Sequence, residues 1–338
     1  MENKLVQIIK NQRQVVCPNE RFLFEGQPGG KWLGTSYFYR LLKDNASEIE
    51  KRFEGQVFFV CPRTIVLQTD LFKDFMDQNN LWEFAYQTND DQKIKKKFLE
   101  AEFNRKQKEE LSSIIKIFDK PLAIRSSSLN EDAERVSFAG IFYSIFLPNN
   151  LESIEERNAQ LQDAIKLVYM SQYLEKAKEF YNRFNVLWGD ERMAVIIQEV
   201  AGREHLIKDK RIYYPELSFV SFSYNDYATD MVEPSSGFYR IALGLGVGTV
   251  ELEHNVSIAV NTGRPNPIIG LTCREDIIRN SPQYFYAIDL SKKNNIINEQ
   301  YDFLLKLPVG FLEQTIIERH GTYFDEDFLP STFKIPGR

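Results

Sequence analysis

The sequence predicts an α+β fold in which strands and helices are layered together. Apolar runs of strand length alternate with amphipathic helical stretches along the chain, and several β-rich segments come late in the sequence. This order differs from that of a helical bundle or a β-sandwich. The 338 residues are enough for a large core and for roughly two domains, or one elaborate domain.

The composition predicts a globular protein that does not bind nucleic acid. Apolar residues make up 43% of the chain and charged residues 27%, which excludes a disordered or low-complexity class. The formal net charge of −6 lacks the basic excess of a nucleic-acid surface, although it is compatible with a local anion pocket. The chain has neither a signal-peptide core nor an apolar run of membrane-spanning length, so we expect a soluble, cytoplasmic protein without a membrane partner.

The cysteines and histidines predict neither a disulfide framework nor a zinc site. They are Cys17, Cys61, Cys273, His205, His254 and His320. The cysteines are odd in number and far apart, and the histidines fit no metalloprotease spacing and lie near no nucleophile signature. We therefore expect reduced thiols in the core and surface or structural histidines.

The amino-terminal part alternates strand and helix patterns. A short apolar run at 22–24 and a glycine- and proline-rich turn at 26–30 precede apolar residues at helical spacing, which are Leu33, Tyr37, Phe38, Leu41 and Leu42. Two strand-like runs separated by Pro62 follow, and then a helix from about residue 70, capped by Thr69 or Asp70. Residues 92–118 predict a charged amphipathic helix or a pair of helices.

The rest of the chain continues this mixture of strands and helices. Residues 121–124 predict a buried strand, and long helical material in two pieces follows at 151–184. Further strand patterns lie at 143–148, 192–200, 217–224, 238–246 and 255–261. The last segment, from about residue 275, is richer in helix patterns.

Cationic and amide side chains follow strand patterns or glycine turns at four places. Arg125 comes after the apolar run 121–124, where a buried strand is expected to end, and Lys31 follows a glycine pair. A small-residue turn ends at Gly140, and Gln198 closes the run MAVII. Phosphate sites need N–H groups on a glycine turn, a mobile lysine charge and an arginine fork that holds two oxygens. The set is consistent with polyphosphate binding.

Two common nucleotide motifs are missing from the sequence. The turn before Lys31 lacks the GxxxxGK[ST] spacing of a P-loop. GLGVG at 244–248 lacks the GxGxxG spacing of a dinucleotide fingerprint, and no clear helix pattern follows it. On these residues alone, solvated side chains remain the alternative to a phosphate site.

At these positions the chain resembles the amino-terminal ATP-grasp domain, the PEP/pyruvate-binding domain, of phosphoenolpyruvate synthases and pyruvate phosphate dikinases. GGKW at 29–32 resembles the GGK motif of this family, and AIRSSSLNEDAERVSFAG at 123–140 resembles its RSS and SFAG block. MAVIIQEV at 193–200 resembles its glutamine-bearing strand. LSFVSFSYN resembles the FSRNP segment, although Val220 replaces an alanine and Asp226 a proline. The blocks occur in the family's order and cover about residues 22–250.

The resemblance implies an ATP-grasp fold with mixed, largely antiparallel sheets flanked by helices. Residues 1–120 would form the amino-terminal subdomain with the GGK motif and a helical insertion, and 121–270 the nucleotide-binding core. Residues 271–338 would form a helical extension or the start of a following region. The implied activity is phosphoryl transfer from ATP to a histidine on another domain or chain, with Mg²⁺ as cofactor and a phosphoacceptor domain or protein as partner.

By the same resemblance, eight residues contact the nucleotide: Lys31, Arg125, Ser126, Gly140, Ser144, Gln198, Glu199 and Val200. The lysine and the arginine would hold the ATP phosphates and act in catalysis. Gly140 and Ser144 would lie in the loop over the phosphates. Gln198 and the backbone of residues 199–200 would line the adenine pocket. The serines at 126–128 are either loop-forming caps or direct ligands.

Val247 departs from the family's metal motif. Active dikinases carry GLGE, whose glutamate contacts the metal and the nucleotide, whereas this chain has GLGV, and valine offers Mg²⁺ no oxygen ligand. The glutamine and arginine expected downstream are also missing, and Ala259 and Asn261 lie on that strand. Glu251 is a candidate replacement for the metal ligand, and Asp132 either fixes its turn or lies near the metal. The form GLGVGTVE resembles a divergent branch of the family.

The sequence leaves three functions open. The first is an ATP-binding phosphotransferase module that performs half of a dikinase-like reaction, because no histidine lies in the glycine- and threonine-rich context of a phosphoacceptor. The second is a catalytically degenerate nucleotide-binding module with a regulatory or interaction role, which Val247 motivates. The third is a structural or interaction domain, which would not respond to nucleotide at all.

Overall fold

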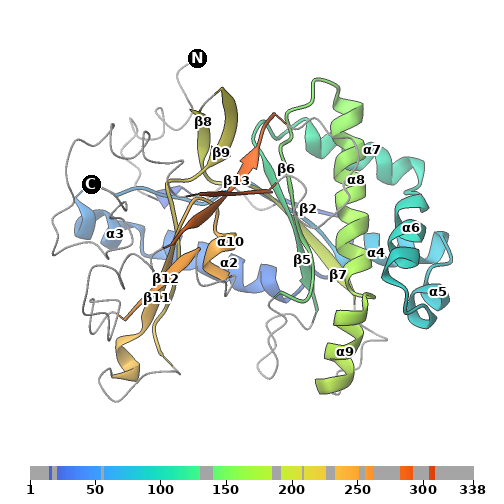
Figure 1. Ribbon diagram of the computed structural model, residues 1–338, viewed down its shortest axis with the longest axis horizontal. Coiled ribbons are helices and arrows are strands. Elements are labelled where there is room, and N and C mark those ends of the chain that lie inside the picture. Colours follow the sequence, from blue (N-terminus) through green and yellow to red (C-terminus); the bar gives the residue numbers. More distant parts are fainter. Residues whose placement is uncertain are drawn as a thin grey trace. The chain divides into compact units, whose positions relative to one another are not determined.

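The chain folds into two compact units. The computed structural model describes residues 15–16, 21–54, 57–129, 140–184, 192–207, 209–225, 233–250, 256–261, 282–291 and 304–308. Unit 1 comprises Met1–Val200 and Lys293–Asp302, and unit 2 comprises Ala201–Lys292 and Phe303–Arg338. Figure 1 labels the helices and strands of both units. The three segments expected from the sequence do not coincide with these units, and their boundaries stay a prediction.

Unit 1 is built on a five-stranded sheet with the strand order β2-β4-β7-β5-β6. Its strands are β2 (Arg21–Leu23), β4 (Thr64–Leu67), β5 (Leu122–Ser128), β6 (Ser144–Leu147) and β7 (Met193–Glu199). β2 and β4 run parallel, and the other neighbouring pairs are antiparallel. A second sheet pairs β1 (Val15–Val16) with β3 (Phe59–Val60). Mixed, mostly antiparallel sheets with helices confirm the predicted α+β class.

The central strands of this sheet are buried on both faces. β4 and β7 read TIVL and MAVIIQE, and all but one of their residues are buried. Continuous apolar and β-branched runs of this kind suit strands that are covered on both sides. The helix α2 (Gly30–Asp44) covers one face, where Trp32 and Tyr39 pack with Val66 and Ile196. A layer of helices that includes α4 and α8 packs on the other side (Figure 1).

Three of the helices described in unit 1 begin at a side-chain cap from the preceding residue. The described helices of this unit are α2, α3 (Ala46–Phe53), α4 (Thr69–Gln78), α5 (Trp82–Gln87), α6 (Asp91–Glu100), α7 (Arg105–Ile115), α8 (Ile154–Ser171) and α9 (Glu175–Phe184). The Asp90 carboxylate accepts the first N–H groups of α6, Asn104 and Gln107 form a capping box on α7, and Ser153 caps α8. Of the two alternatives predicted for 92–118, the structure has the pair of helices, and the two predicted pieces at 151–184 are confirmed.

The predicted cap of α4 is wrong. The residue before this helix is Gln68, whose side chain makes no capping hydrogen bond, and Thr69 is already the first helical residue. The Thr69 hydroxyl accepts a hydrogen bond at 2.9 Å from the backbone N–H of Gln27 instead. A contact with a residue 42 positions away has replaced the local cap that the sequence suggested.

The helix α2 has the predicted extent but buries a different face. Trp32 and Tyr39 are its buried residues. Four of the apolar residues that predicted the helix are exposed instead, namely Leu33, Tyr37, Phe38 and Leu41. The apolar spacing therefore identified the helix but not the side of it that contacts the sheet, because two large aromatic rings dominate the packing.

Tyr169 offers a test of the helical layer. Its ring is buried on α8 against Phe72 and Phe75. Its hydroxyl is buried as well and has no hydrogen-bond partner among the described residues. A buried hydroxyl that lacks a partner costs free energy, so Tyr169→Phe should raise the free energy of unfolding by about 1 kcal/mol. Urea unfolding checks this, and Tyr37→Phe, at an exposed tyrosine of α2, should leave stability unchanged.

The same residue predicts a pH effect. Burial raises the pKa of Tyr169, so the folded protein keeps a proton that the unfolded chain releases near the ordinary tyrosine pKa of about 10. The free energy of unfolding should therefore fall as the pH rises above 10, and Tyr169→Phe should lessen that fall. An unchanged slope between pH 9 and pH 11 in urea titrations would contradict this account.

Unit 2 contains two antiparallel sheets. One has the order β10-β11-β12, from β10 (Leu217–Phe222), β11 (Phe238–Leu243) and β12 (Ser257–Asn261). The other has the order β14-β13-β9-β8, from β8 (Arg203–Ile207), β9 (Lys210–Tyr214), β13 (Tyr284–Asp289) and β14 (Leu304–Pro308). Two short helical turns, η1 (Pro234–Ser236) and α10 (Val247–Val250), complete its described elements.

The helix pattern expected in the last segment is wrong for the residues described there. From residue 275 onward, the described residues form the strands β13 and β14 and no helix. The sequence of β13, YFYAID, is aromatic and β-prone, and five of its six residues are buried in the sheet. Tertiary burial has overridden the local helical spacing.

In the part of the chain that the structure describes, no helix is both long enough and apolar enough to cross a membrane. Cys61 is buried in the core, as expected for this cysteine.

Candidate functional site

The glycine turn before Lys31 is held by a strand that is distant in sequence. Gly29 precedes α2 with a φ of 77°, and no side chain of the turn caps the helix. The backbone N–H of Trp32 donates instead to the Ser127 hydroxyl at 3.1 Å, across 95 residues of sequence. The same hydroxyl donates to the carbonyl of Pro28 at 2.9 Å. Ser127 thus caps α2 from β5 and fixes both sides of the turn.

The turn approaches β5 so closely that only glycine fits. A Cβ atom on Gly29 would lie 1.8 Å from the Ser127 carbonyl oxygen, far inside any normal contact distance. The positive φ of Gly29 also favours glycine over residues with a side chain. The GGK motif therefore has a packing reason in addition to any role in binding.

Lys31 lies next to the serines of β5. The Lys31 ammonium donates to the Ser126 hydroxyl at 3.2 Å. Of the two alternatives left open for the three serines, the loop-forming one does not hold, because residues 126–128 are buried strand residues of β5. Their role as direct ligands stays a prediction. They extend past β6, which pairs only with residues 122–125. The glycine turn docks against β5 at Ser126 and Ser127.

Arg125 lies within β5 and not at its end. The strand continues to Ser128 because β7 pairs with it along its whole length. Arg125 is opposite Ile196 on one side and Ser144 on the other, and directly opposed residues project from the same face of a sheet. Ser127 alternates to that face as well. The half-buried Arg125 and Ser144 therefore lie on the face that carries α2.

Gln198 connects α2 to the sheet. Its side-chain amide donates at 3.1 Å to the Tyr39 hydroxyl and at 3.1 Å to the Thr64 hydroxyl. It lies on the same face as Arg125, two residues further along the β5–β7 ladder, because its opposite residue is Ala123. These contacts give Gln198 a structural role in this conformation, and its place in an adenine pocket stays a prediction.

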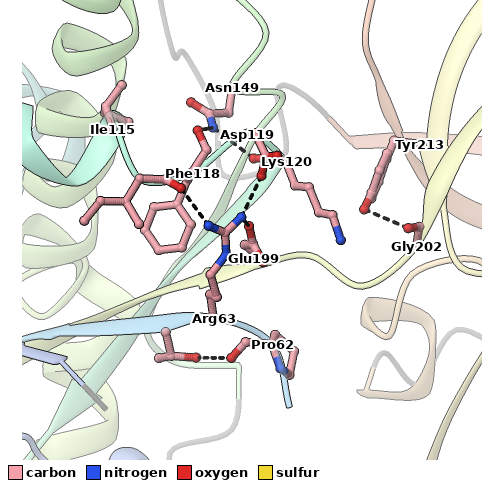
Figure 2. Close-up of polar contacts among 12 residues, drawn as sticks. Pro62, Arg63, Ile115, Phe118, Asp119, Lys120, Asn149, Glu199, Gly202 and Tyr213 are labelled. Carbon is pink, nitrogen blue, oxygen red and sulfur yellow. Dashed lines mark hydrogen bonds and ion pairs between the residues drawn. The ribbon is translucent and has the colours of Figure 1, made fainter. Parts of the chain in front are cut away.

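The side chain of Glu199 belongs to an ion cluster around Arg63. The Arg63 guanidinium donates to Glu199 at 2.5 Å, to Asp119 at 2.7 Å and to the carbonyl of Ile117 at 2.8 Å (Figure 2). It also lies over the ring of Phe118, 5.8 Å from the centroid. The hydrogen bond that Arg63 donates to Glu199 raises the pKa of the guanidinium, which stays charged.

The loop before β5 is fixed by a second arginine. Arg157 donates to the carbonyls of Ile115 at 3.0 Å and Phe118 at 2.7 Å, and to the Asn149 side chain at 2.8 Å. Asn149 in turn donates to the carbonyl of Lys120 at 2.9 Å (Figure 2). These donors satisfy the carbonyl groups of the loop and set the point at which β5 starts.

The backbone N–H groups at the end of β7 already have acceptors. Glu199 donates to the carbonyl of Arg63 at 3.0 Å, and Val200 donates to the carbonyl of Pro121 at 2.9 Å. In this conformation these N–H groups are used by the fold. The adenine contact implied for them stays a prediction.

Gly140 lies at the start of the described chain that leads into β6. Its φ is 74°, and its carbonyl accepts a hydrogen bond from the Lys176 ammonium at 2.7 Å. A Cβ atom at Gly140 would meet nothing within 4 Å, so the glycine is exposed and not required by packing. Asp132, whose role was left open above, lies outside the described residues.

In unit 2, Val247 begins the short helix α10 of the GLGVG segment. Gly244 has a φ of 69°, and a Cβ atom there would lie 2.3 Å from the Tyr286 carbonyl oxygen. The first glycine of this segment therefore serves a close approach of two backbones. Glu251, the candidate metal ligand, lies outside the described residues.

The described residues provide no group of three His, Cys, Asp or Glu side chains that could hold a metal ion. Val247 offers no oxygen ligand to a metal ion. Around Lys31 and Arg125, the oxygen ligands for a metal ion would be serine hydroxyls of the protein and phosphate groups of a bound nucleotide.

Two residues of this region were missed or underrated by sequence reasoning. Ser127 stood in the serine triplet, but nothing local showed that it caps a helix almost a hundred residues earlier. Arg63 follows a proline between two strands and carries no recognisable motif. Its partners at 117–119 and 199 become neighbours only in the folded sheet.

The sequence matches a known family over most of its length. The matching family is the AMP/ATP-binding domain of pyruvate phosphate dikinase, and the match covers residues 43–272, more than half of the chain. It includes Arg125 and Gln198, whereas Lys31 precedes it. Curated proteins gave no match. The chain therefore belongs to the family of the pyruvate phosphate dikinase AMP/ATP-binding domain.

Proposed function

We propose that unit 1 binds the phosphates of ATP at the amino-terminal end of α2, between Lys31 and Arg125. The observation that carries this proposal is the docking of the GGK turn onto the serines of β5, which places the Lys31 ammonium 3.2 Å from Ser126. Membership of a family defined by AMP and ATP binding supports the identity of the ligand. The first N–H groups of a helix of 15 residues add a partial positive charge to the lysine and the arginine.

The chemistry of the proposed site is charge neutralisation. Lys31 supplies a point charge that can move from Ser126 to a phosphate oxygen, and Arg125 supplies a planar fork from a rigid strand. Ser144, directly opposite Arg125, can donate its hydroxyl to the same phosphate group. Mg²⁺ would enter with the nucleotide, since this ion is commonly held by substrate phosphates.

The proposed reaction is phosphoryl transfer from ATP to a histidine on another domain or chain. A histidine nitrogen would attack the phosphorus, and the bond to the leaving phosphate oxygen would break as charge builds on that oxygen. Lys31 and Arg125 would stabilise that charge, which is the main task of a protein in such a transfer.

A second candidate function is a nucleotide-binding module that regulates and does not catalyse. Val247 favours it, because this position offers no oxygen to a metal. The two functions differ in a single measurement, the consumption of ATP when an acceptor domain of the family is supplied. Binding without consumption supports the regulatory module, and consumption supports the phosphotransferase.

Calorimetric titration with ATP and Mg²⁺ tests the binding site. We expect saturable binding, and we expect Lys31→Ala and Arg125→Ala each to weaken it about ten- to hundredfold, because each removes a charge-assisted contact of about 1.5–3 kcal/mol. Matched controls are Lys43→Ala, at the exposed far end of α2, and Arg40→Ala on the same helix. Equal affinity in all variants, or no binding by the folded protein at millimolar ATP, would refute the proposed site.

A further inference from the structure

We infer that Ser127 is a positioning residue for nucleotide binding, which acts by clamping the glycine turn that carries Lys31. This inference rests on the proposed function for its effect on ATP, but the clamp itself is a feature of the fold. Ser127 is fully buried and its hydroxyl makes two hydrogen bonds, one from the N–H of Trp32 and one to the carbonyl of Pro28. It therefore does not need to touch the nucleotide.

The clamp joins two segments that no local contact holds together. Gly29 has no side chain to cap α2, so Ser127 provides the hydrogen bond that a local capping residue normally supplies. One hydroxyl is hydrogen-bonded to Pro28 before the glycine pair and to Trp32 after it, so it fixes both ends of the turn. Lys31 lies between these two residues in the sequence.

Ser126 and Ser127 hold different parts of the GGK motif. Ser127 fixes the backbone of the turn, while Ser126 accepts the Lys31 ammonium at 3.2 Å. Gly29 brings its backbone against the carbonyl of Ser127, which leaves no room for a side chain. The turn is thus held at three points on one strand, and that strand also carries Arg125. The same strand therefore carries Arg125 and holds the turn of Lys31 in place.

Without the Ser127 hydroxyl, the start of α2 should detach from β5. The N–H of Trp32 would lose its acceptor in a buried place, and the first turn of α2 would then open more often to regain contact with water. Lys31 would spend less time beside Ser126, where its ammonium is held. ATP would bind more weakly although none of its own ligands had been removed.

A double-mutant cycle between Ser127→Ala and Lys31→Ala tests this inference. We expect Ser127→Ala to weaken ATP binding about five- to tenfold, and we expect the double variant to bind no worse than Lys31→Ala by more than about twofold. Such a result means that the serine acts through the lysine. Independent, multiplying effects would overturn the inference.

Ser171→Ala is the matched control. Ser171 is also fully buried, accepts a hydrogen bond from the N–H of Tyr143 at 3.1 Å and donates one to the carbonyl of Val168 at 2.7 Å. Its removal should cost similar stability and leave ATP affinity within about twofold. If Ser127→Ala and Ser171→Ala weaken ATP binding equally, the effect is a general loss of stability and the inference is wrong.

Hydrogen exchange of the Trp32 amide provides a readout that does not depend on ATP. Ser127→Ala should speed its exchange at least about tenfold, and Ser171→Ala should not. If the wild-type protein binds no ATP, the proposed function fails, and this exchange rate still decides whether the clamp exists. Unchanged exchange in Ser127→Ala would overturn the inference even if ATP binds as proposed.

Discussion

Replacing Gly29 with alanine is expected to lower the free energy of unfolding by about 3 kcal/mol or more and to weaken ATP binding by about a hundredfold. The added Cβ would lie 1.8 Å from the Ser127 carbonyl oxygen and 2.6 Å from the Ser127 hydroxyl. Neither β5 nor the turn can move aside easily, because β5 is paired with β7 along its whole length. Relief of the clash must separate the turn from the strand, which breaks the serine clamp and displaces Lys31.

Gly34 provides the control for this substitution. It lies in α2 on the exposed side, and a Cβ atom there would meet nothing within 4 Å. Gly34→Ala should therefore stabilise the protein by about 0.5–1 kcal/mol, since alanine favours a helix interior over glycine. Urea unfolding and ATP titration of both variants measure the contrast. A Gly29→Ala protein as stable as the wild type would show that the turn does not approach β5 in this way.

Replacing Arg63 with methionine is expected to destabilise unit 1 by about 2–3 kcal/mol. The Glu199 carboxylate is only 8% exposed and would lose the guanidinium that lies 2.5 Å from it. Asp119 is 79% exposed and should contribute little, because solvent screens such a charge. The Arg63 side chain itself is 40% exposed, which keeps the expected loss below that of a fully buried ion pair.

The cause can be separated from a loss of packing by a second substitution. Glu199→Gln in the Arg63→Met background removes the unpaired charge, so the double variant should recover about 1 kcal/mol or more. Asp119→Asn is the matched control at the exposed acidic partner, and it should change stability by less than about 0.5 kcal/mol. Urea unfolding at pH 7 measures all four proteins. A double variant less stable than Arg63→Met alone would contradict the role assigned to the buried charge.

Local sequence patterns were sufficient to predict the fold class and most of the elements. The run MAVIIQE predicted β7 because continuous apolar, β-branched residues suit a strand covered on both faces. The helical spacing at 151–184 predicted α8 and α9, because residues three or four positions apart lie on one face of a helix. These interactions span three or four residues, so their signature is contained in the sequence.

The candidate site was predicted in part. The motifs around Lys31 and Arg125 suggested a phosphate site, and the fold brings Lys31 onto the serine that follows Arg125. The prediction that Arg125 ends its strand was wrong, since pairing with β7 extends β5 by three residues. The extent of a strand depends on its partner, and a partner 70 residues away leaves no mark on the local pattern.

The sequence by itself determined the layered α+β class and the helix that follows the glycine turn. Only the tertiary structure decided that Ser127 caps α2, that α2 buries Trp32 and Tyr39 and not its more continuous apolar stripe, and that Arg63 holds Glu199. The physical reason is the same in each case. These contacts join residues many positions apart, so their free energy depends on which surfaces the folded sheet places against each other and not on local spacing.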